Sequence, residues 1–346
     1  MSSESLVFAH QREAVVSLSQ RFESIDVFTA EVSQDYLPEN VRVFKLKWTK
    51  NAPLRNVINI LKTLIPHLIR NRNALVFTHM TDVHAALISP LTFILRMRHV
   101  LWYAHATNSI YLISSSFFVS KIASSTSGSC NLRINTRKIV YINQGINYKD
   151  FPFYYRSFER INNFFYYGRL DRSKNIHVLL DLVEILNKDA NDYTIDFYGK
   201  SAGADSENYL EELRLNPIVK SPNSPVRFNN SIKRKDIPII SQQFDCFLNL
   251  FSGSLDKTLI EATFMGLPVV TWNQEFCNQF GTWSGKPVEE TLNFVIEEII
   301  SLRKMPKHKL RMELARRFEL ASRFHSFDGW IDRLTSILQA DCVLPR

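Results

Sequence analysis

Short apolar runs alternate with stretches of helical period along the first half of the chain. The runs are rich in Val, Ile, Phe and Tyr and are too short for helices, so they predict strands over residues 5–9, 25–30, 41–46, 74–78, 100–103 and 138–142. Helices are predicted between them, for example over residues 13–21 and 54–70. This alternation is typical of a parallel sheet with helices on both faces.

The second half repeats the pattern. Apolar residues recur at helical spacing from Ile176 to Leu186 and from Leu259 to Met265, and residues 306–339 form a charged helical tail. Strands are predicted over residues 163–167, 193–198, 226–228, 246–250 and 268–272. The sequence therefore predicts an α/β fold with two doubly wound, Rossmann-like domains. Their expected bounds are 1–150 and 151–325, followed by a C-terminal helix at 326–346 that packs back on the first domain.

Composition excludes several classes of protein. Of the 346 residues, 45% are hydrophobic and 22% are charged, as in a globular chain. No run of about 18 uncharged apolar residues predicts a membrane-spanning helix, and the N-terminus lacks the pattern of a signal peptide. The four cysteines have no metal-ligand spacing, so neither a disulfide framework nor a metal site is expected, and a reducing compartment fits.

Positive charge is concentrated in the first half. Residues 1–160 contain 19 Lys and Arg against 10 Asp and Glu, whereas residues 161–346 contain 23 against 24. Between Val41 and Lys149 the only acidic residue is Asp82. A solvated basic surface and a domain that faces an anionic partner explain this surplus equally well. Nucleic acid is not the expected partner, because no nucleic-acid motif accompanies the charge.

Two stretches that follow predicted strands have the composition of anion-binding loops. In GRLDRSKN, at residues 168–175, Gly168 permits a sharp turn, and Arg169 and Lys174 can clamp a diphosphate before a helix begins. In SGSLDKTLIE, at residues 252–261, small residues lead into a helix whose first N–H groups can hold phosphate oxygens. Glu261 can accept both hydroxyls of a ribose. Taken alone, solvated loop cations and a solvated glutamate are the commoner interpretation.

These stretches resemble the motifs of glycosyltransferase family 4 (group 1), a large family of retaining enzymes with the GT-B fold. GRLDRSKN resembles its diphosphate motif, VRFNNSI at 226–232 its base-binding turn, residues 250–270 its glutamate-containing donor motif, and INQGINYKDF at 142–151 the end of its first domain. The motifs run in the family's order from about residue 139 to 272, whereas the resemblance of the first half is architectural. The resemblance implies two Rossmann-like domains that face a central cleft.

The resemblance also implies roles for particular residues. Arg169 and Lys174 would bind the donor diphosphate and stabilise the departing nucleotide, and Glu261 would hold the ribose. His105, after a central strand of the first domain, would lie close to the sugar, with His79 as the second choice. Other donor contacts would come from the base-binding turn and the start of the donor-motif helix, at Asn230, Ser231, Ser254, Leu255, Asp256, Lys257 and Thr258, with Gly168 shaping the diphosphate turn.

Three features depart from the family's pattern. Gly253 stands eight positions before Glu261, where the family has a first glutamate that can bind hydroxyls of the donor sugar. Asn230 replaces the glycine of the base-binding turn, and asparagine also tolerates a left-handed backbone. Residues 8–12 replace the expected Gly-rich loop. Gly253 and the missing loop leave open a second hypothesis, namely a non-catalytic GT-B subunit that binds and activates a partner transferase.

The function that the resemblance implies is transfer of a hexose from a nucleoside-diphosphate sugar, of the UDP or GDP type. The acceptor would be a hydroxyl of a glycan or of a lipid-linked molecule, in polysaccharide biosynthesis and with retention. No cofactor is expected, and the protein's own cations would make a metal unnecessary. We expect a cytoplasmic protein.

The predicted helix at 54–70 is amphipathic and basic. Its apolar face runs from Leu54 to Leu68 and is flanked by Arg55 and Lys62. Such a helix can lie on an anionic membrane surface, but the favoured interpretation is a cover for the sheet of its own domain. The surplus charge of the first half is left unexplained by that role. Weak peripheral association with the anionic inner face of a membrane would explain it.

Overall fold

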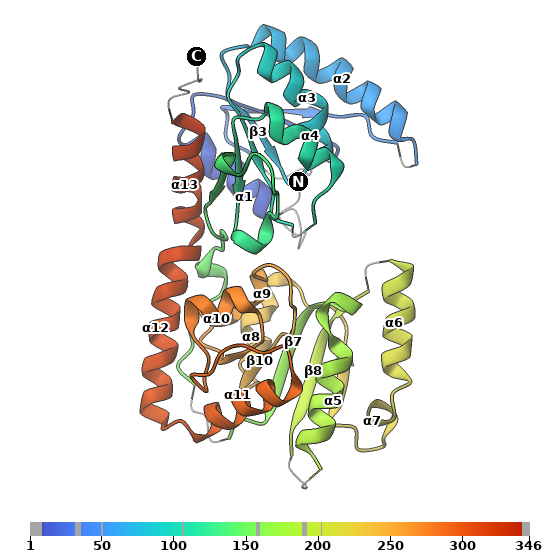
Figure 1. Ribbon diagram of the computed structural model, residues 1–346, viewed down its shortest axis with the longest axis vertical. Helices are drawn as coiled ribbons and strands as arrows, with labels where there is room; N and C mark the ends of the chain where they lie inside the picture. The colour runs from blue at the N-terminus through green and yellow to red at the C-terminus, as the bar shows by residue number, and fades with distance from the viewer. Residues whose placement is uncertain are drawn as a thin grey trace. The chain divides into compact units, whose positions relative to one another are not determined.

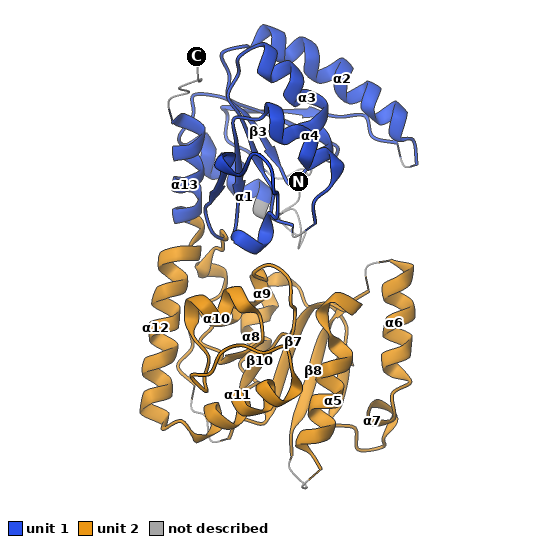
Figure 2. Ribbon diagram, viewed as in Figure 1, with its two compact units in different colours: residues 1–143, 328–346 blue, residues 144–327 orange. Residues whose placement is uncertain are grey.

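The chain forms two α/β units. The computed structural model describes residues 9–31, 36–49, 51–105, 107–156, 160–188, 192–201 and 203–340. Unit 1 comprises residues 1–143 and 328–346, and unit 2 comprises residues 144–327 (Figure 2). Each unit contains a parallel sheet, so the predicted fold class is confirmed. The domain bounds expected from the sequence stay predictions.

Unit 1 is built on a four-stranded parallel sheet. Its strands, in their order across the sheet, are β3 (Val76–His79), β4 (His99–Trp102), β5 (Lys121–Ser124) and β6 (Ile139–Tyr141). A separate parallel pair consists of β1 (Ile25–Thr29) and β2 (Val41–Lys45). Val100 and Leu101 of the central strand β4 are completely buried, as expected for a strand covered on both faces.

The helices of unit 1 come from both ends of the chain. They are α1 (Ala9–Ser19), α2 (Pro53–Arg70), α3 (Asp82–Ile94), α4 (Ile110–Phe118) and α13 (Phe327–Gln339) (Figure 1). The ring of Trp330 in α13 meets that of Trp102 edge-on, with centroids 5.2 Å apart. Arg98 Nε also donates a hydrogen bond of 2.8 Å to the carbonyl of Ile337. The C-terminal helix is therefore tied to the sheet that begins more than 200 residues earlier.

Helix α2 covers its own unit, although its buried face differs from the one that the sequence predicts. Ile60, Leu64 and Leu68 belong to a buried cluster in unit 1. Leu54 and Ile58, which the sequence analysis placed on the apolar face, are exposed. The buried stripe follows an i, i+4 spacing that starts at Asn56, whose side chain holds the backbone of Thr49 through two hydrogen bonds. A polar residue thus opens the buried face, which is why the apolar pattern alone misplaced it.

Two further segments of unit 1 concern the sequence predictions: one strand was missed, and one predicted strand lies mostly outside the described residues. Strand β5 was not predicted, because it has only four residues and includes Lys121 and Ser124. It follows α4 at once, so the apolar pattern gives no break between helix and strand. Of the strand expected at 5–9, residues 5–8 lie outside the described residues and Ala9 begins α1.

Unit 2 is built on a five-stranded parallel sheet. Across the sheet, its strands are β11 (Val269–Val270), β10 (Cys246–Leu248), β7 (Asn163–Arg169), β8 (Thr194–Lys200) and β9 (Val226–Asn229). Side chains of β7 alternate between the two faces. Phe164 and Tyr166 join one core cluster, whereas Phe165 and Tyr167 join the other. Both faces of this sheet are therefore buried, as the unbroken aromatic run of β7 indicates.

The helices of unit 2 cover these two faces. They are α5 (Ile176–Leu186), α6 (Ala204–Arg214), α7 (Pro217–Lys220), α8 (Ile237–Ser241), α9 (Lys257–Phe264), α10 (Gln274–Phe280), α11 (Leu292–Lys304) and α12 (Lys307–His325). The helical tail expected at 306–339 is interrupted at Ser326, which forms an isolated β-bridge with Ile146. Within the described residues, no helix is long and apolar enough to cross a membrane.

Candidate functional site

The chain turns sharply where β7 ends. Gly168 has a φ of 147°, and a Cβ added there would lie 3.2 Å from the hydroxyl of Tyr166. That hydroxyl donates a hydrogen bond of 2.8 Å to the carbonyl of Arg169. The Arg169 side chain is 64% exposed, and its Nη1 lies 3.4 Å from Oδ2 of Asp171. The turn therefore presents a largely solvated guanidinium at the carboxyl end of a central strand, where open parallel sheets bind ligands.

The second cation of this loop is buried. A short 3₁₀ turn (Arg172–Lys174) follows Asp171, and Asn175 closes it in the left-handed region. The Lys174 ammonium lies 2.6 Å from Oδ2 of Asp256 and 3.7 Å from the centre of the Phe251 ring. A carboxylate and an aromatic face thus compensate the desolvation of this charge.

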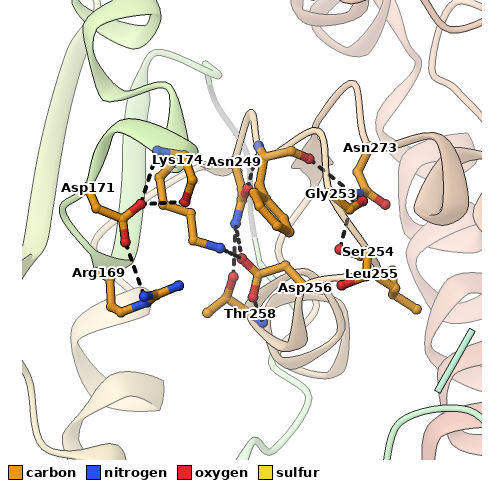
Figure 3. Close-up of polar contacts among 12 residues, drawn as sticks. Arg169, Asp171, Lys174, Asn249, Gly253, Ser254, Leu255, Asp256, Thr258 and Asn273 are labelled. Atoms are coloured by element: carbon orange, nitrogen blue, oxygen red, sulfur yellow. Dashed lines mark hydrogen bonds and ion pairs between the residues drawn. The ribbon is translucent and has the colours of Figure 1, made fainter. Parts of the chain in front are cut away.

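Asp256 joins the turn after β7 to the start of α9 (Figure 3). Its Oδ1 accepts the backbone N–H of Thr258 at 3.2 Å and so caps the helix. The Asn249 amide donates to Asp256 Oδ2 at 3.1 Å and to Thr258 Oγ1 at 3.0 Å. Burial raises the pKa of Asp256, but Lys174 and these hydrogen bonds outweigh it and hold that pKa below its usual value. Asp256 is therefore an ionised part of the network.

The loop between β10 and α9 is anchored from α10. The amide of Asn273, the N-cap of α10, donates to the carbonyls of Phe251 at 3.1 Å and Gly253 at 2.9 Å (Figure 3). The backbone N–H of Leu255 donates to Oε2 of Glu275 at 2.7 Å. The Leu255 amide, which the resemblance assigns to the donor, has a protein acceptor in this structure.

Gly253 lies directly beside the Phe251 ring. A Cβ at position 253 would be only 2.1 Å from Phe251 Cζ. The ring thus fills the space that a side chain at 253 needs, and it does so while stacking on Lys174. A side chain at position 253 therefore requires the Phe251 ring to move or a smaller residue at position 251.

Glu261 lies on the buried side of α9, one turn into the helix. Its Oε2 accepts the hydroxyl of Tyr167 at 2.9 Å, and its Oε1 lies 3.3 Å from Nη1 of Arg234. Burial raises its pKa, and Arg234 and Tyr167 offset only part of that rise. The Tyr167 hydroxyl also reaches the carbonyl of Thr258 at 3.5 Å, which links Glu261 to the Lys174–Asp256 network.

Arg234 is a candidate that the sequence analysis missed. Besides Glu261, it contacts Oδ2 of Asp150 at 3.2 Å and lies 4.7 Å above the Phe151 ring. The available signal was the basic triplet from Lys233 to Lys235, directly after the VRFNNSI turn. The triplet alone does not indicate a site, because Arg234 becomes a site candidate only through its contact with Glu261, 27 residues away in the sequence.

A pocket of about 490 Å³ opens beside the base-binding turn. Asn230 and Ser231 are exposed and line it together with Tyr198, Lys233 and Asp236. This pocket lies at the carboxyl ends of β8 and β9, as the rule for parallel sheets predicts. Lys257 is exposed at the first position of α9, and Ser254 is half-buried in the anchored loop. The base-turn residues thus border a pocket, whereas Lys174, Asp256 and Thr258 form a hydrogen-bonded network.

The histidine candidates belong to unit 1. His105 is exposed in the loop after β4, and its ring meets that of Tyr103 edge-on at 5.4 Å. His79 is half-buried, with Nδ1 3.2 Å from the Gln11 amide nitrogen and its ring stacked on Trp102. His105 is therefore the more accessible of the two. Among the described residues, no group of three or more His, Cys, Asp and Glu side chains could hold a metal ion.

The residues that build this site fall in a segment with known relatives. Residues 161–282 match the family model for Glycosyl transferases group 1. This segment begins two residues before β7 and ends two residues after α10, so it contains Lys174, Asp256 and Glu261. No curated protein sequence matches the chain.

Solved structures resemble the chain over nearly its whole length. HepE of Anabaena, in complex with UDP-glucose, has a TM-score of 0.73 at 14% identity, covering 99% of this chain and 98% of that one. Sucrose-phosphate synthase of Thermosynechococcus elongatus has a TM-score of 0.71 at 13% identity, covering 95% and 92%. A glycosyltransferase of Rickettsia africae has a TM-score of 0.70 at 14% identity, covering 98% and 97%. The fold of this chain is GT-B, whereas membership of family 4 stays a prediction.

Proposed function

We propose that this protein is a glycosyltransferase that moves a hexose from a nucleoside-diphosphate sugar to a hydroxyl of a glycan or lipid-linked acceptor. The donor is of the UDP or GDP type, and UDP is the first choice because HepE was solved with UDP-glucose. Retention at the anomeric carbon and a role in polysaccharide biosynthesis belong to the proposal. The match of residues 161–282 to the group 1 glycosyltransferase family model supports it.

The observation that carries the proposal is the pair of cations in the turn after β7. Lys174 is buried and pre-oriented by Asp256, whereas Arg169 is largely exposed and able to move. Together they can neutralise a diphosphate as its charge grows, without reorganising solvent. Glu261 completes the nucleotide site. A carboxylate has about four lone-pair positions. Tyr167 and Arg234 occupy only some of those of Glu261, so the others can accept ribose hydroxyls.

The chemistry that follows is a substitution at the anomeric carbon. The acceptor oxygen forms the new glycosidic bond, the bond from the anomeric carbon to the donor phosphate oxygen breaks, and the nucleoside diphosphate leaves with that electron pair. Arg169 and Lys174 stabilise the leaving charge, and His105 contacts the sugar. These cations take the role that a metal ion has in other transferases, so chelation with EDTA is expected to leave activity intact.

Two variants test the site against a matched control. Arg169→Ala and Glu261→Ala are expected to lower UDP or GDP binding, read as a smaller thermal shift with nucleotide, and to lower sugar transfer. Arg172→Ala is the control, because this arginine lies in the same loop but pairs with Glu212 and stacks on Tyr209. Unchanged nucleotide binding and transfer in both site variants would refute the proposed site.

A second candidate is a non-catalytic GT-B subunit that binds and activates a partner transferase. The packing of Phe251 against Gly253 favours it, because an aromatic ring stands beside the position of the family's sugar-binding glutamate. A panel of nucleotide-sugars separates the two functions. Stabilisation by a nucleotide-sugar followed by its hydrolysis or transfer supports the enzyme, whereas no stabilisation by UDP, GDP or ADP supports the subunit.

The location proposed for this protein is the cytoplasm, with weak peripheral association at the inner face of the membrane. A lipid-linked acceptor would be presented at that surface. The net charge of the first 160 residues, with 19 basic against 10 acidic side chains, supports attraction to anionic lipid.

A further inference from the structure

Helix α4 exposes several apolar residues on one face and buries two of its three serines. Ile110, Ile113 and Phe117 follow an i, i+3, i+7 spacing and share one face. They are 74%, 37% and 55% exposed. Ser115 and Ser116 are completely buried, and their hydroxyls donate to helix carbonyls at 3.0 and 2.7 Å. An apolar outer face of this kind departs from the polar one that an amphipathic surface helix shows in water.

The end of α3 extends this apolar face. Phe93 is 54% exposed and Ile94 is 74% exposed. The Phe93 ring meets the Phe118 ring of α4 edge-on, with centroids 5.9 Å apart. The C-terminal ends of the two helices therefore lie side by side, and each carries exposed apolar side chains, which together we call the apolar patch. Patches of this kind mark interaction sites on folded proteins.

Cations surround the end of α4. Lys138 Nζ donates to the carbonyls of Ser116 and Phe117, each at 2.9 Å, so its ammonium lies at the helix C-terminus. Lys121 Nζ donates to the carbonyl of Arg137 at 3.3 Å. Burial lowers the pKa of Lys138, and repulsion from Lys121 lowers it further, as expected for two neighbouring positive charges.

The acidic residue of this region lies at the other end of α3. Between Val41 and Lys149 the sequence contains only Asp82, which begins α3 and accepts a hydrogen bond from Ser109. Arg96, two residues beyond Ile94, is exposed and adds to the positive charge near the patch. The apolar patch is thus rimmed by positive charge at its C-terminal end, where the sequence supplies no carboxylate between Val83 and Lys149.

We propose that the α3–α4 surface, defined by Phe93, Ile94, Ile113, Phe117, Lys121 and Lys138, docks this protein on an anionic lipid bilayer. The apolar side chains enter the boundary between headgroups and acyl chains, and the ammonium groups meet lipid phosphates. This inference rests on the membrane association included in the proposed function and gives it a surface. It does not depend on the nucleotide site, which belongs to unit 2.

Charge complementarity favours a bilayer over a protein partner. An anionic membrane attracts each Lys or Arg close to its surface, and it accepts isoleucine and phenylalanine without needing a shaped pocket. Between Val41 and Lys149, the stretch that contains α3 and α4, the sequence has one carboxylate, Asp82, so this stretch offers little negative charge to a basic protein surface. Helix α2 also exposes Leu54 and Ile58, but it is the weaker candidate, because most of its apolar face packs into the core of unit 1.

The test is flotation of the full chain with phosphatidylcholine vesicles that contain or lack phosphatidylglycerol. The unsubstituted protein is expected to float with anionic vesicles only, and salt is expected to reduce binding. The double variant Ile113→Ser and Phe117→Ser is expected to partition at least about tenfold less, because it removes two inserted apolar side chains. Lys121→Glu is expected to weaken binding only to the vesicles that contain phosphatidylglycerol.

A matched control is available in unit 2. Ile185 and Ile300 are 37% and 39% exposed, close to the exposure of Ile113, and lie in α5 and α11. Their double serine variant is expected to bind vesicles as the unsubstituted protein does. Thermal shift with nucleotide in every variant separates this proposal from the proposed function, because loss of vesicle binding leaves that shift unchanged. Absence of binding to anionic vesicles, or equal binding by the Ile113 and Phe117 variant, overturns the proposal.

Discussion

Helices α4 and α5 have similar apolar content and opposite surroundings. Both follow a loop at the end of a strand, and both are rich in Ile, Leu, Val or Phe. Helix α5 places Leu179, Leu180 and Val183 in the core of unit 2, with no exposed surface. Helix α4 leaves Ile110, Ile113 and Phe117 exposed. Apolar composition therefore predicts that a helix will be covered, but not whether the cover is the protein's own sheet or something outside the chain.

The same contrast holds for charge. In unit 2, the Lys174 ammonium is paired with Asp256 and stacked on Phe251, so it is part of the packed interior. In unit 1, Lys121 and Lys138 lie beside each other and donate to backbone carbonyls. The lysine of unit 2 is thus paired inside the protein, whereas α4 and its neighbouring lysines in unit 1 present apolar and basic groups outward. The predictions below test this difference with matched substitutions in the two units.

The largest effect is expected from placing a carboxylate on each helix. Leu180→Asp buries an unpaired charge and is expected to lower the free energy of unfolding by about 4 kcal/mol or more. Ile113→Asp, on the exposed face of α4, is expected to lower it by less than about 1 kcal/mol. Urea denaturation followed by circular dichroism measures both. A loss at Ile113 as large as that at Leu180 would mean that α4 is a core helix after all.

Removing one lysine from each unit is expected to have the next largest effect. Lys174→Met leaves Asp256 buried without its partner, so a loss of about 3 kcal/mol in unfolding free energy is expected. Lys121→Met removes a cation that has no carboxylate partner in the described part of the chain, and the expected change is within about 0.5 kcal/mol. Adding Asp256→Asn to Lys174→Met is expected to recover part of the loss. Equal stability of the two lysine variants contradicts the contrast between the units.

The raised pKa of Glu261 predicts a pH dependence of nucleotide binding. Only the ionised carboxylate accepts both ribose hydroxyls, and burial moves its pKa above the ordinary 4.5. Nucleotide affinity is therefore full above the raised pKa and falls as pH drops through it. Two hydrogen bonds to a charged group correspond to roughly a tenfold change or more. Calorimetric titration across pH measures this. The Glu261→Gln variant serves as reference, and an equally steep fall in it would assign the titration to another group.

The smallest effect is expected at Phe251. Phe251→Leu keeps an apolar filler beside Gly253 but removes the ring face under Lys174, so a loss of about 1 kcal/mol is expected. Phe117→Leu, on the exposed face of α4, is expected to change stability by less than about 0.5 kcal/mol. Thermal unfolding of the two variants compares them. A Phe251 variant as stable as the unsubstituted protein would show that the ring only fills space.

The sequence predicts the framework of both units because that framework depends on local pattern. The aromatic run of β7 and the apolar spacing of α5 are visible within a few residues. Strand β5 was missed because four residues with Lys121 at one end show no alternation. The α2 face was misplaced because Asn56 begins the buried stripe, and its partner Thr49 lies in another segment.

The sequence predicts which loops form the candidate site, but not which of their side chains contact one another. Gly168, Lys174 and Glu261 could be chosen because they lie at a strand end or near a helix start within stretches that resemble the family's motifs, which is local information. The pairing of Lys174 with Asp256 spans 82 residues, and that of Tyr167 with Glu261 spans 94, so neither leaves a periodic signal. Arg234 was missed for the same reason. The exposure of α4 was likewise invisible, since an apolar helix looks the same in sequence whether or not the protein covers it.

The anchoring of the β10–α9 loop has a consequence for protein engineering. Asn273 and Glu275, at the start of α10, hold the loop's backbone at Phe251, Gly253 and Leu255. A graft of residues 249–261 into another GT-B scaffold would arrive without these supports. The transferable module therefore extends through α10, and a chimera that takes this loop should exchange residues 249–280 as one block.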